Sequence, residues 1–542
     1  MASTEMTPVP PNVETPSSSR PTLKQSHEGE HHGDYGGQEI PLLQATKVFA
    51  LCAAVNSCNL GFDIGVSTSV GQLIQEDFEL SDVQREIFVG SLNFFAMFGA
   101  FASNYFSDSY GRRQTFIIAA IGFIFGIIIM SLAPNFGILI FGRVFVGLGV
   151  GVGMAVDPVY ISEISPAKHR GRLVTWSEIA INAGIVLGFS MGIFFADINT
   201  GAQWRIMLAM GMILPSVMIF LVINVMPESP RWFVSQGMEA EAKTVLEQVY
   251  PPNYPVTEIV DDIKEALERE RIAEQTLGWS VICSPTPAFR RMLIVGIGTA
   301  VAQQAVGIDA LQYYLTDVLE TSGVESNRMQ SFIMVILGGV KLAVIFVSGS
   351  LFDTRGRRPL FFASLLGMAV ALLALSIIYW TSDNDNPNAV LLTIVIAIYL
   401  ACFSFGMGPG AWLVPSEVFA TSIRAKAMSI ATTLNRATAC LMSSTFLSTK
   451  NTLTWAGFFL LMVFVCLIVC VFLYFYLPET KGRSLEDMSV YFAEITGDTS
   501  ILEAEKKLRG DEAQAVLDGA ETPTGNAAEQ EASATQEGGT LT

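Results

Sequence analysis

Long apolar segments separated by short polar ones run through most of this chain. Residues 359–380 and 457–477 contain no charged side chain, and each segment is as long as the roughly 20 residues that a helix needs to cross the hydrocarbon core of a bilayer. A buried helix of a soluble protein is usually shorter. The pattern therefore predicts about twelve membrane-spanning helices. They lie near residues 44–70, 86–106, 115–133, 136–160, 174–195, 205–226, 291–316, 329–351, 359–380, 389–413, 424–447 and 455–477.

The predicted spans form two groups of six, which indicates an all-α membrane protein with two pseudo-symmetric six-helix halves. We expect an N-terminal bundle at 42–227 and a C-terminal bundle at 291–480, joined by a cytosolic helical linker at 228–290. Residues 1–41 are expected to be a disordered cytosolic tail, and residues 481–542 an acidic cytosolic tail. Residues 1–41 lack the apolar core of a cleaved signal peptide.

Charged motifs at the ends of the spans occur twice, about 250 residues apart, which indicates a duplicated half. Transporters with a central site are commonly built from such repeats. The repeated motifs are Asp108-Ser-Tyr-Gly-Arg-Arg113 with Asp353-Thr-Arg-Gly-Arg-Arg358, Glu163 and Arg170 with Glu417 and Arg424, and Pro227-Glu228 with Pro478-Glu479.

Composition agrees with a membrane protein and argues against an enzyme. Hydrophobic residues make up 51% of the chain, charged residues make up 15%, and the mean hydropathy is +0.45. The net charge of −18 comes largely from the C-terminal tail, so it does not indicate a nucleic-acid or other basic partner. Lys and Arg concentrate in the loops on one side, which places both termini in the cytosol. The seven cysteines and four histidines suggest no disulfide framework or metal site, and no Walker or dinucleotide-binding motif is present.

Six motifs in a fixed order give the chain a family resemblance over residues 45–492. Together they resemble the sugar porter family of the major facilitator superfamily, which implies a twelve-helix major facilitator fold and transport of sugars. The motifs are Gly61-Phe-Asp-Ile-Gly-Val66, Gly142-Arg143 with Gly147, Gly149 and Gly151, Pro158-Val-Tyr-Ile-Ser-Glu163, Pro227-Glu-Ser-Pro-Arg-Trp232, Gln303-Gln304, and Pro478-Glu-Thr-Lys-Gly-Arg483.

A further set of motifs is similar to the plant-type polyol/monosaccharide proton symporters. The chain departs from that branch at Asn104, where the loop motif has Gly, and at Asp157, where a small neutral residue is usual. The motifs that carry this closer resemblance are Asp82-Val-Gln, Glu178-Ile-Ala-Ile-Asn-Ala-Gly184, Gln303-Gln-Ala-Val-Gly-Ile-Asp309 and Leu434-Asn-Arg436.

Acids and arginines at the cytosolic ends of the helices can form ion pairs between neighbouring helices. The resemblance implies that these groups form a cytosolic gate, which latches the outward-facing state and loosens when the carrier opens inward. The alternative is a set of arginines that only establish membrane topology. The predicted gate residues are Asp108, Arg112, Arg113, Glu163, Arg170, Asp353, Arg357, Arg358, Glu417 and Arg424.

Asp63 and Arg143 both lie inside predicted spans, where ionisable groups are expensive and usually face a partner. An aspartate beside an arginine stays ionised, whereas moving the arginine away favours the protonated form. With the resemblance, this predicts that Asp63 carries the coupling proton and that Arg143 controls it. The alternative is a static structural ion pair.

Sugar recognition needs amides, carboxylates and hydroxyls fixed around a cavity, with aromatic rings for the C–H faces of the substrate. Spacing in the seventh span predicts that Gln304, Asp309 and Tyr313 share one helical face, with Gly307 allowing the backbone to bend. The alternative is a polar face that only packs helices together. The predicted substrate-binding residues are Glu178, Gln303, Gln304, Asp309, Tyr313, Tyr314, Trp412, Asn435 and Arg436.

Glu178 and Arg436 stand where many sugar porters have Gln and Trp, so we predict a charge network that favours flexible polyols over rigid pyranoses. The alternative is that the two residues merely pair with each other.

Lys341 is a further base inside a span, for which the sequence identifies no partner. The segment 406–410, Gly-Met-Gly-Pro-Gly, interrupts the tenth span and is expected to act as a hinge or a fixed kink.

The sequence therefore predicts a proton-coupled symporter that imports polyols or monosaccharides by alternating access. Its expected partners are the substrate, the proton and the lipid bilayer, with no cofactor besides the coupling proton, no metal and no obligate protein partner. The plasma membrane is the expected location. The alternatives are a facilitative hexose or inositol uniporter and a sugar sensor that does not transport.

Overall fold

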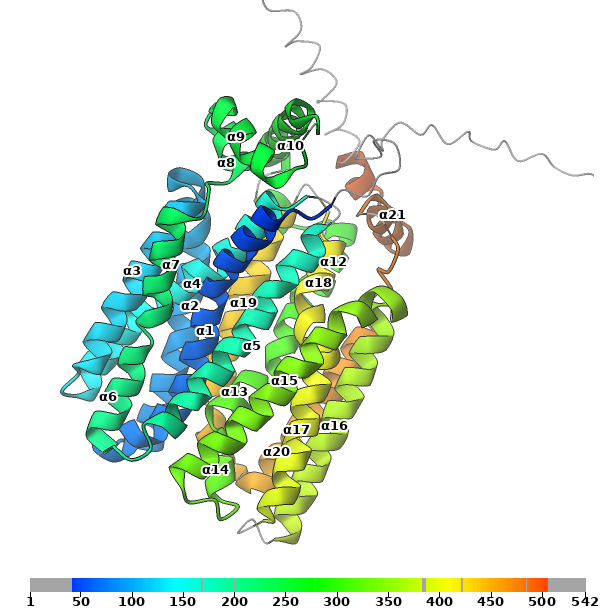
Figure 1. The fold of residues 1–542 in the computed structure, drawn as a ribbon. Coiled ribbons are helices and arrows are strands. Elements are labelled where there is room, and N and C mark those ends of the chain that lie inside the picture. Colours follow the sequence, from blue (N-terminus) through cyan, green and yellow to red (C-terminus); the bar gives the residue numbers. More distant parts are fainter. Residues whose placement is uncertain are drawn as a thin grey trace, which may run out of the picture. The chain divides into compact units, whose positions relative to one another are not determined.

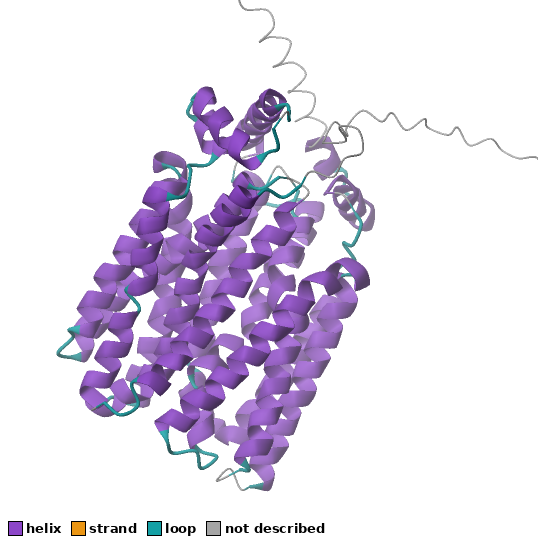
Figure 2. Ribbon diagram, viewed as in Figure 1, coloured by secondary structure: helices purple, strands orange, loops and turns teal. Residues whose placement is uncertain are grey.

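A computed structural model describes residues 41–166, 169–198, 200–252, 254–277, 279–382, 387–420, 423–483 and 485–504. Every regular element in these ranges is a helix (Figure 2), which confirms the all-α prediction. The predicted N-terminal tail and most of the predicted C-terminal tail lie outside the described residues.

The helices of the first half pack side by side along one direction (Figure 1). The sixth predicted span is divided into two helices, which meet at residues 211–212. The helices of this half are α1 (Gln44–Asp77), α2 (Asp82–Tyr110), α3 (Arg112–Ser131), α4 (Phe136–Ile164), α5 (Arg170–Phe194), α6 (Thr200–Met210) and α7 (Ile213–Asn224).

The second half begins after four short or amphipathic helices that follow α7. These are α8 (Pro230–Ser235), α9 (Glu239–Val249), α10 (Val256–Leu277) and α11 (Ser280–Cys283). The second half comprises α12 (Pro287–Ala305), α13 (Ile308–Tyr313), α14 (Leu315–Glu320), α15 (Asn327–Arg355), α16 (Arg357–Thr381), α17 (Ala389–Cys402), a π-helix (Phe403–Met407), α18 (Gly408–Val418), α19 (Arg424–Ser444) and α20 (Phe446–Tyr476). Helix α21 (Leu485–Thr496) follows the second half.

Eleven helical segments in the described residues are long and apolar enough to cross a membrane. The predicted span that is missing from this set, 424–447, corresponds to α19, whose lower hydropathy reflects polar residues such as Asn435 and Arg436. Because α19 packs against α2 and α12, these side chains point into protein rather than lipid. The result agrees with a twelve-helix membrane fold.

Helices α8, α9, α10 and α21 lie together at one end of the bundle (Figure 1), which we call the linker end. Helix α8 contacts α4, and α21 contacts α12 and α18. The other end, where α13 leads into α14, we call the far end.

The seventh predicted span is broken at Gly307, whose φ of +84° is the left-handed region that favours glycine. Helix α12 ends at Ala305 and α13 begins at Ile308. The helix is thus interrupted between Gln304 and Asp309, yet both of these side chains line the cavity described below, whereas Tyr313 does not, so the predicted shared face holds for the first two only. The bend itself was predicted.

Helices α1 and α5 approach closely because glycines face the neighbouring backbone. A Cβ atom built on Gly61 would lie 1.9 Å from the carbonyl oxygen of Ile181, and one on Gly184 would lie 2.1 Å from that of Cys58. Small residues at such contacts let membrane helices pack backbone to backbone. This contact holds Asp63 of α1 and Glu178 of α5 within one rigid layer of the first half.

Candidate functional site

A polar cavity of about 60 Å³ lies between the two halves, midway along the bundle. The first half contributes residues from α1, α4 and α5, and the second half contributes residues from α12, α13, α15, the π-helix, α18 and α19. Its polar lining consists of Glu178, Asn182, Gln303, Gln304, Asp309, Lys341, Ser404, Trp412 and Arg436, and its apolar lining includes Leu60, Ile64, Met154, Ile181, Ile185, Ile345 and Phe403.

The two neighbouring glutamines at the end of α12 have different roles in the cavity wall. Gln303 Nε2 donates to Gly408 O at 2.9 Å, and Gln303 Oε1 accepts from Asn435 Nδ2 at 2.8 Å. Gln304 Oε1 has no hydrogen-bond partner in the described residues, although it is buried. Gln303 is therefore held by the protein, whereas Gln304 presents a free acceptor at the cavity.

Four charged side chains line the cavity. Arg436 Nη1 lies 3.8 Å from Asp309 Oδ2, and the guanidinium also donates to Asn435 Oδ1 at 2.6 and 3.0 Å and to Asn93 Oδ1 at 3.2 Å. The electrostatic neighbours of Glu178 are Lys341 first, then Arg436 and Asp309. Arg436 thus pairs with Asp309, and a direct ion pair between Glu178 and Arg436 does not occur in the described residues.

Lys341 is the charged residue of the cavity that our set of predicted substrate-binding residues omitted, together with the polar Asn182 and Ser404. Its ammonium group donates to Gln312 Oε1 at 2.7 Å and lies 5.5 Å from the centre of the Phe403 ring. A lysine inside an apolar span was the available signal, but its partner sits on α13, which is distant in sequence from α15. Only the bend at Gly307 brings the two together.

Three predicted substrate-binding residues lie outside the cavity lining. Tyr314 donates to Ser443 O at 2.9 Å and stacks on Phe446 at 4.7 Å between ring centres, so its ring is used in packing. Tyr313 is buried behind the wall, and Asn435 is saturated by contacts with Ala300 O, Gln303 and its neighbour Arg436. The break after α12 leaves Tyr313 outside the cavity that Asp309 lines, although the two were predicted to share a face.

Asp63 and Arg143 form a fully enclosed ion pair within the first half. Arg143 Nη1 donates to both carboxylate oxygens of Asp63, at 2.8 and 3.0 Å, and Nη2 donates to Ser67 Oγ at 2.6 Å. The guanidinium also lies 4.3 Å from the centre of the Phe88 ring. The predicted ion pair between Asp63 and Arg143 is present, and the guanidinium also contacts the Ser67 hydroxyl and the face of the Phe88 ring.

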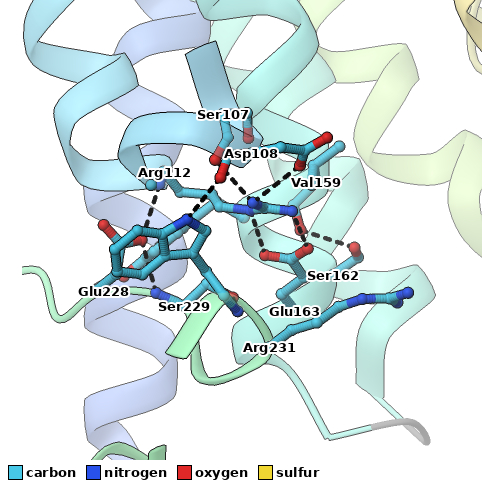
Figure 3. A network of polar contacts seen from close by, with 12 residues as sticks. Ser107, Asp108, Arg112, Val159, Ser162, Glu163, Glu228, Ser229 and Arg231 are labelled. Carbon is cyan, nitrogen blue, oxygen red and sulfur yellow. Dashed lines mark hydrogen bonds and ion pairs between the residues drawn. The ribbon is translucent and has the colours of Figure 1, made fainter. Parts of the chain in front are cut away.

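At the linker end of the first half, arginine and carboxylate side chains converge from three helices (Figure 3). Arg112 at the start of α3 makes a two-pronged ion pair with Glu163 of α4, both bonds being 2.8 Å, and also contacts Asp108 at 3.3 Å. Arg113 donates to Val222 O at 2.8 Å. Glu228, after α7, accepts from the backbone N–H groups of Arg112 and Arg113.

The second half repeats this arrangement. Arg357 at the start of α16 pairs with Glu417 of α18 at 2.6 Å, and Glu479 accepts from the backbone N–H groups of Arg357 and Arg358 at 2.9 and 3.0 Å. The side chain of Asp353 lies outside the described residues. Each network joins helices of one half, so most of the predicted gate residues lie in two separate clusters, and their role as a gate stays a prediction.

The carboxyls of Glu228 and Glu479 differ in their electrostatic environment. Burial raises the pKa of Glu228, although hydrogen bonds from Ser229, Arg113 and Arg112 oppose that shift. Burial also acts on Glu479, but backbone hydrogen bonds from Arg357, Lys481 and Arg358 outweigh it and lower its pKa.

The remaining predicted gate residues, Arg170 and Arg424, begin α5 and α19. Arg424 Nε donates to Phe419 O at 3.3 Å.

Polar contacts between the two halves lie at the far end and midway along the bundle. Arg85 of α2 makes two hydrogen bonds to Asp317 of α14, at 2.6 and 2.7 Å. Other pairs that join the halves are Thr68 with Gln312 O, Gln72 with Glu320, Glu86 with Ser448, Asp82 with Asn451, Asn93 with Arg436, and Asp197 with Arg328. The far end is therefore closed by contacts across the halves.

Comparison with known proteins gives one consistent result. Residues 49–492 match the family described as "Sugar (and other) transporter". Polyol transporter 5 of Arabidopsis thaliana is 37% identical over 462 residues, which cover 82% of this chain and 85% of the relative, and "Probable polyol transporter 4" of the same plant is 35% identical over 467 residues, covering 86% and 89%. The structure of the proton:xylose symporter XylE with bound 6-bromo-6-deoxy-D-glucose superposes with a TM-score of 0.71 at 25% identity, covering 82% of this chain and 99% of XylE.

Proposed function

Because this chain belongs to the sugar transporter family, we propose that it is a proton-coupled symporter that carries polyols or monosaccharides across a membrane by alternating access. The observation that carries the proposal is the enclosed Asp63–Arg143 ion pair in a bundle that also holds a polar cavity between its halves. A buried carboxylate with a single strong cationic partner binds a proton when that partner withdraws. The relatives named for polyol transport and the proton:xylose symporter support the same assignment.

Proton coupling would follow from competition for Arg143. While Arg143 donates to both oxygens of Asp63, the carboxylate is compensated and the proton is not needed. A movement that separates the guanidinium from Asp63 while it keeps its contacts with Ser67 and the Phe88 ring leaves Asp63 as a buried, uncompensated carboxylate, which takes up a proton. Proton uptake and release would therefore accompany the change between states.

Substrate binding would use the polar and charged groups that line the cavity. Gln304 Oε1 offers an acceptor, Glu178 and Asp309 offer carboxylate oxygens, and Lys341 offers a donor. These groups match the alternating donors and acceptors of a polyhydroxylated substrate. Trp412 supplies an aromatic wall for its C–H face.

We further propose that the linker end faces the cytosol, that both termini are cytosolic and that the plasma membrane is the site of action. The excess of Lys and Arg at the linker end supports this orientation. With the far end closed by the Arg85–Asp317 pair, the described state would be open or opening toward the cytosol.

The decisive experiment is a substrate panel in proteoliposomes with an imposed pH gradient. Sorbitol, mannitol, xylitol, inositol, glucose and xylose are offered with and without the gradient, and internal pH is recorded. Accumulation above equilibrium together with internal acidification is the expected outcome. Equilibration without a proton signal would identify a uniporter, and saturable binding without any flux would identify a sensor.

A further inference from the structure

Asp157 is a buried carboxyl that neither the cavity nor the Asp63–Arg143 pair uses. It lies on α4 directly before Pro158, and its side chain has no exposed surface. Oδ2 accepts a hydrogen bond from Ser57 Oγ of α1. Oδ1 has no hydrogen-bond partner in the part of the chain that the structure describes. An enclosed acid at this depth in a helical bundle is costly, which marks it as a candidate for function.

Two serine hydroxyls face the Asp157 carboxyl. Besides Ser57 of α1, Ser177 Oγ of α5 lies toward the carboxyl as a second donor, although its geometry falls short of a regular hydrogen bond. Pro158 lacks an N–H group, so the carbonyl oxygen of Met154 cannot accept the usual helical hydrogen bond from it. An ionised Asp157 can only accept hydrogen bonds here, whereas the protonated carboxyl is itself a donor.

No charged side chain of the described residues acts on the Asp157 carboxyl. On α1, the nearby ionisable groups are Cys58, next to Ser57, and Asp63, which Arg143 compensates. On α5, Glu178 faces the cavity instead. On α4 itself, Tyr160 donates to Pro227 O and Glu163 pairs with Arg112. An ionised Asp157 would therefore be an uncompensated buried charge, unlike Asp63.

The position of Asp157 places it on the linker side of Asp63. Its partner Ser57 precedes Asp63 on α1 by about 9 Å of helix, at 1.5 Å per residue, toward the end that carries the linker. Met154, one turn before Asp157, lines the cavity, so the carboxyl lies just behind the cavity wall. Its neighbours belong to α1, α4 and α5, so the charge would sit where three helices of the first half meet.

We propose that Asp157 is a second proton-binding carboxyl of this carrier and that transport proceeds only while it is protonated. The inference rests on the proposed function. When the carboxyl loses its proton, the uncompensated charge binds hydroxyl donors of α1 and α5 to α4 and resists rearrangement of these helices. Alkalinity on the linker side would then slow the carrier, independently of coupling through Asp63.

The test is equilibrium exchange of radiolabelled sorbitol or xylose in oriented proteoliposomes, with pH varied only on the linker side. Every protein carries Asp63→Asn, so that titration of Asp63 does not contribute. In this background, exchange is expected to fall about tenfold per pH unit above the point where Asp157 ionises. With Asp157→Asn added, which mimics the neutral acid, the rate is expected to stay at its low-pH value throughout.

Ser57→Ala in the same background gives an independent check if Asp157→Asn folds poorly. Removing a donor to the charged form disfavours ionisation, so the alkaline fall is expected to move to higher pH. Ser190→Ala on α5, whose hydroxyl bonds only to Val186 O of its own helix among the described groups, is the matched control and should leave the profile in place.

Two results would overturn the proposal. One is an alkaline fall of the same midpoint and steepness with and without Asp157→Asn, which would give this carboxyl a structural role only. The other is exchange that requires sodium ions and loses this requirement in Asp157→Asn, which would make the bound cation sodium. Loss of accumulation and proton flux in the parent protein would instead contradict the proposed symport, and exchange would still report on Asp157.

Discussion

Arg85 of α2 and Asp317 of α14 join the two halves at the far end through a two-pronged ion pair of 2.6 and 2.7 Å. The arginine side chain is 3% exposed and also donates to Gln75 and lies over the Tyr314 ring. Arg328 and Asp197 also pair across the halves, but with side chains that are 56% and 81% exposed. The two ion pairs therefore differ in energy because the first is buried and the second is exposed, and not because their distances differ.

The first prediction concerns this closure. Arg85→Ala leaves Asp317 as a largely buried, unpaired charge, which should destabilise the far-end-closed state by about 3–5 kcal/mol. Spin labels on α2 and α14 should report a longer distance between the halves at that end. Arg328→Ala is the control, because an exposed pair contributes less than about 1 kcal/mol. Equal distance distributions in Arg85→Ala and the parent protein would exclude Arg85 as a determinant of closure.

The second prediction concerns coupling. Asp63→Asn removes the carboxylate that Arg143 compensates, so uphill accumulation should be abolished while substrate exchange survives at least partly, because the cavity lies elsewhere. Uptake driven by a pH gradient measures the first and counterflow measures the second. Asp77→Asn, also on α1 but in a part-exposed pair with Arg205, should keep accumulation. Continued concentration of substrate by Asp63→Asn under proton drive alone would show that another group carries the proton.

The third prediction separates the two glutamines. Gln304→Ala removes the free acceptor at the cavity and should weaken binding about five- to 150-fold, the equivalent of roughly 1–3 kcal/mol. Gln303→Ala instead removes the donor to Gly408 O and one of the two acceptors of Asn435 Nδ2, so it should chiefly lower thermal stability. Calorimetric titration and thermal unfolding on both variants distinguish the roles. If Gln303→Ala weakened binding and Gln304→Ala did not, the assignment of the two side chains would be reversed.

The fourth prediction concerns the charge network. Because Arg436 lies 3.8 Å from Asp309 and Glu178 is not its ion-pair partner, a double-mutant cycle should show coupling between Arg436→Trp and Asp309→Asn of about 0.5–3 kcal/mol. Arg436→Trp with Glu178→Gln should couple more weakly and should shift preference from polyol toward pyranose by adding an aromatic surface. Competition uptake with sorbitol and glucose measures both effects. A parental polyol-to-hexose ratio in the second pair would show that this network does not determine selectivity.

The fifth prediction uses the carboxyls after α7 and α20. The pKa of Glu479 is lowered in the folded protein, so it contributes stability above its unfolded pKa and loses it as pH falls through the folded value. Glu479→Gln should therefore destabilise the protein at neutral pH, by roughly 1 kcal/mol because the group is part-exposed, and the difference should vanish in acid. For Glu228, whose pKa is raised, neutralisation should cost less at neutral pH. Thermal unfolding at several pH values tests both variants. A loss of stability in Glu479→Gln that grew as the pH fell would contradict the predicted direction of the pH dependence.

The sequence by itself determined the class of the protein and most of its chemistry. Uninterrupted apolar segments of bilayer length can only be helices, because lipid offers no hydrogen-bond partner to an unpaired backbone. Charged residues inside those segments, such as Asp63, Arg143 and Lys341, stand out for the same reason. Repetition of the loop motifs indicated the duplicated halves, and the resemblance predicted the family that the comparisons confirm.

Tertiary structure alone decided which of these groups meet. The bend at Gly307 sends Asp309 to the cavity, turns Tyr313 and Tyr314 into the packing, and brings Gln312 to Lys341. Arg436 pairs with Asp309 rather than Glu178 because the contact depends on how α13 and α19 pack. Such contacts join residues of different helices, 29 positions apart for Gln312 and Lys341, and the rotation and tilt of these helices come from packing, which a one-dimensional pattern of apolar and polar residues does not encode.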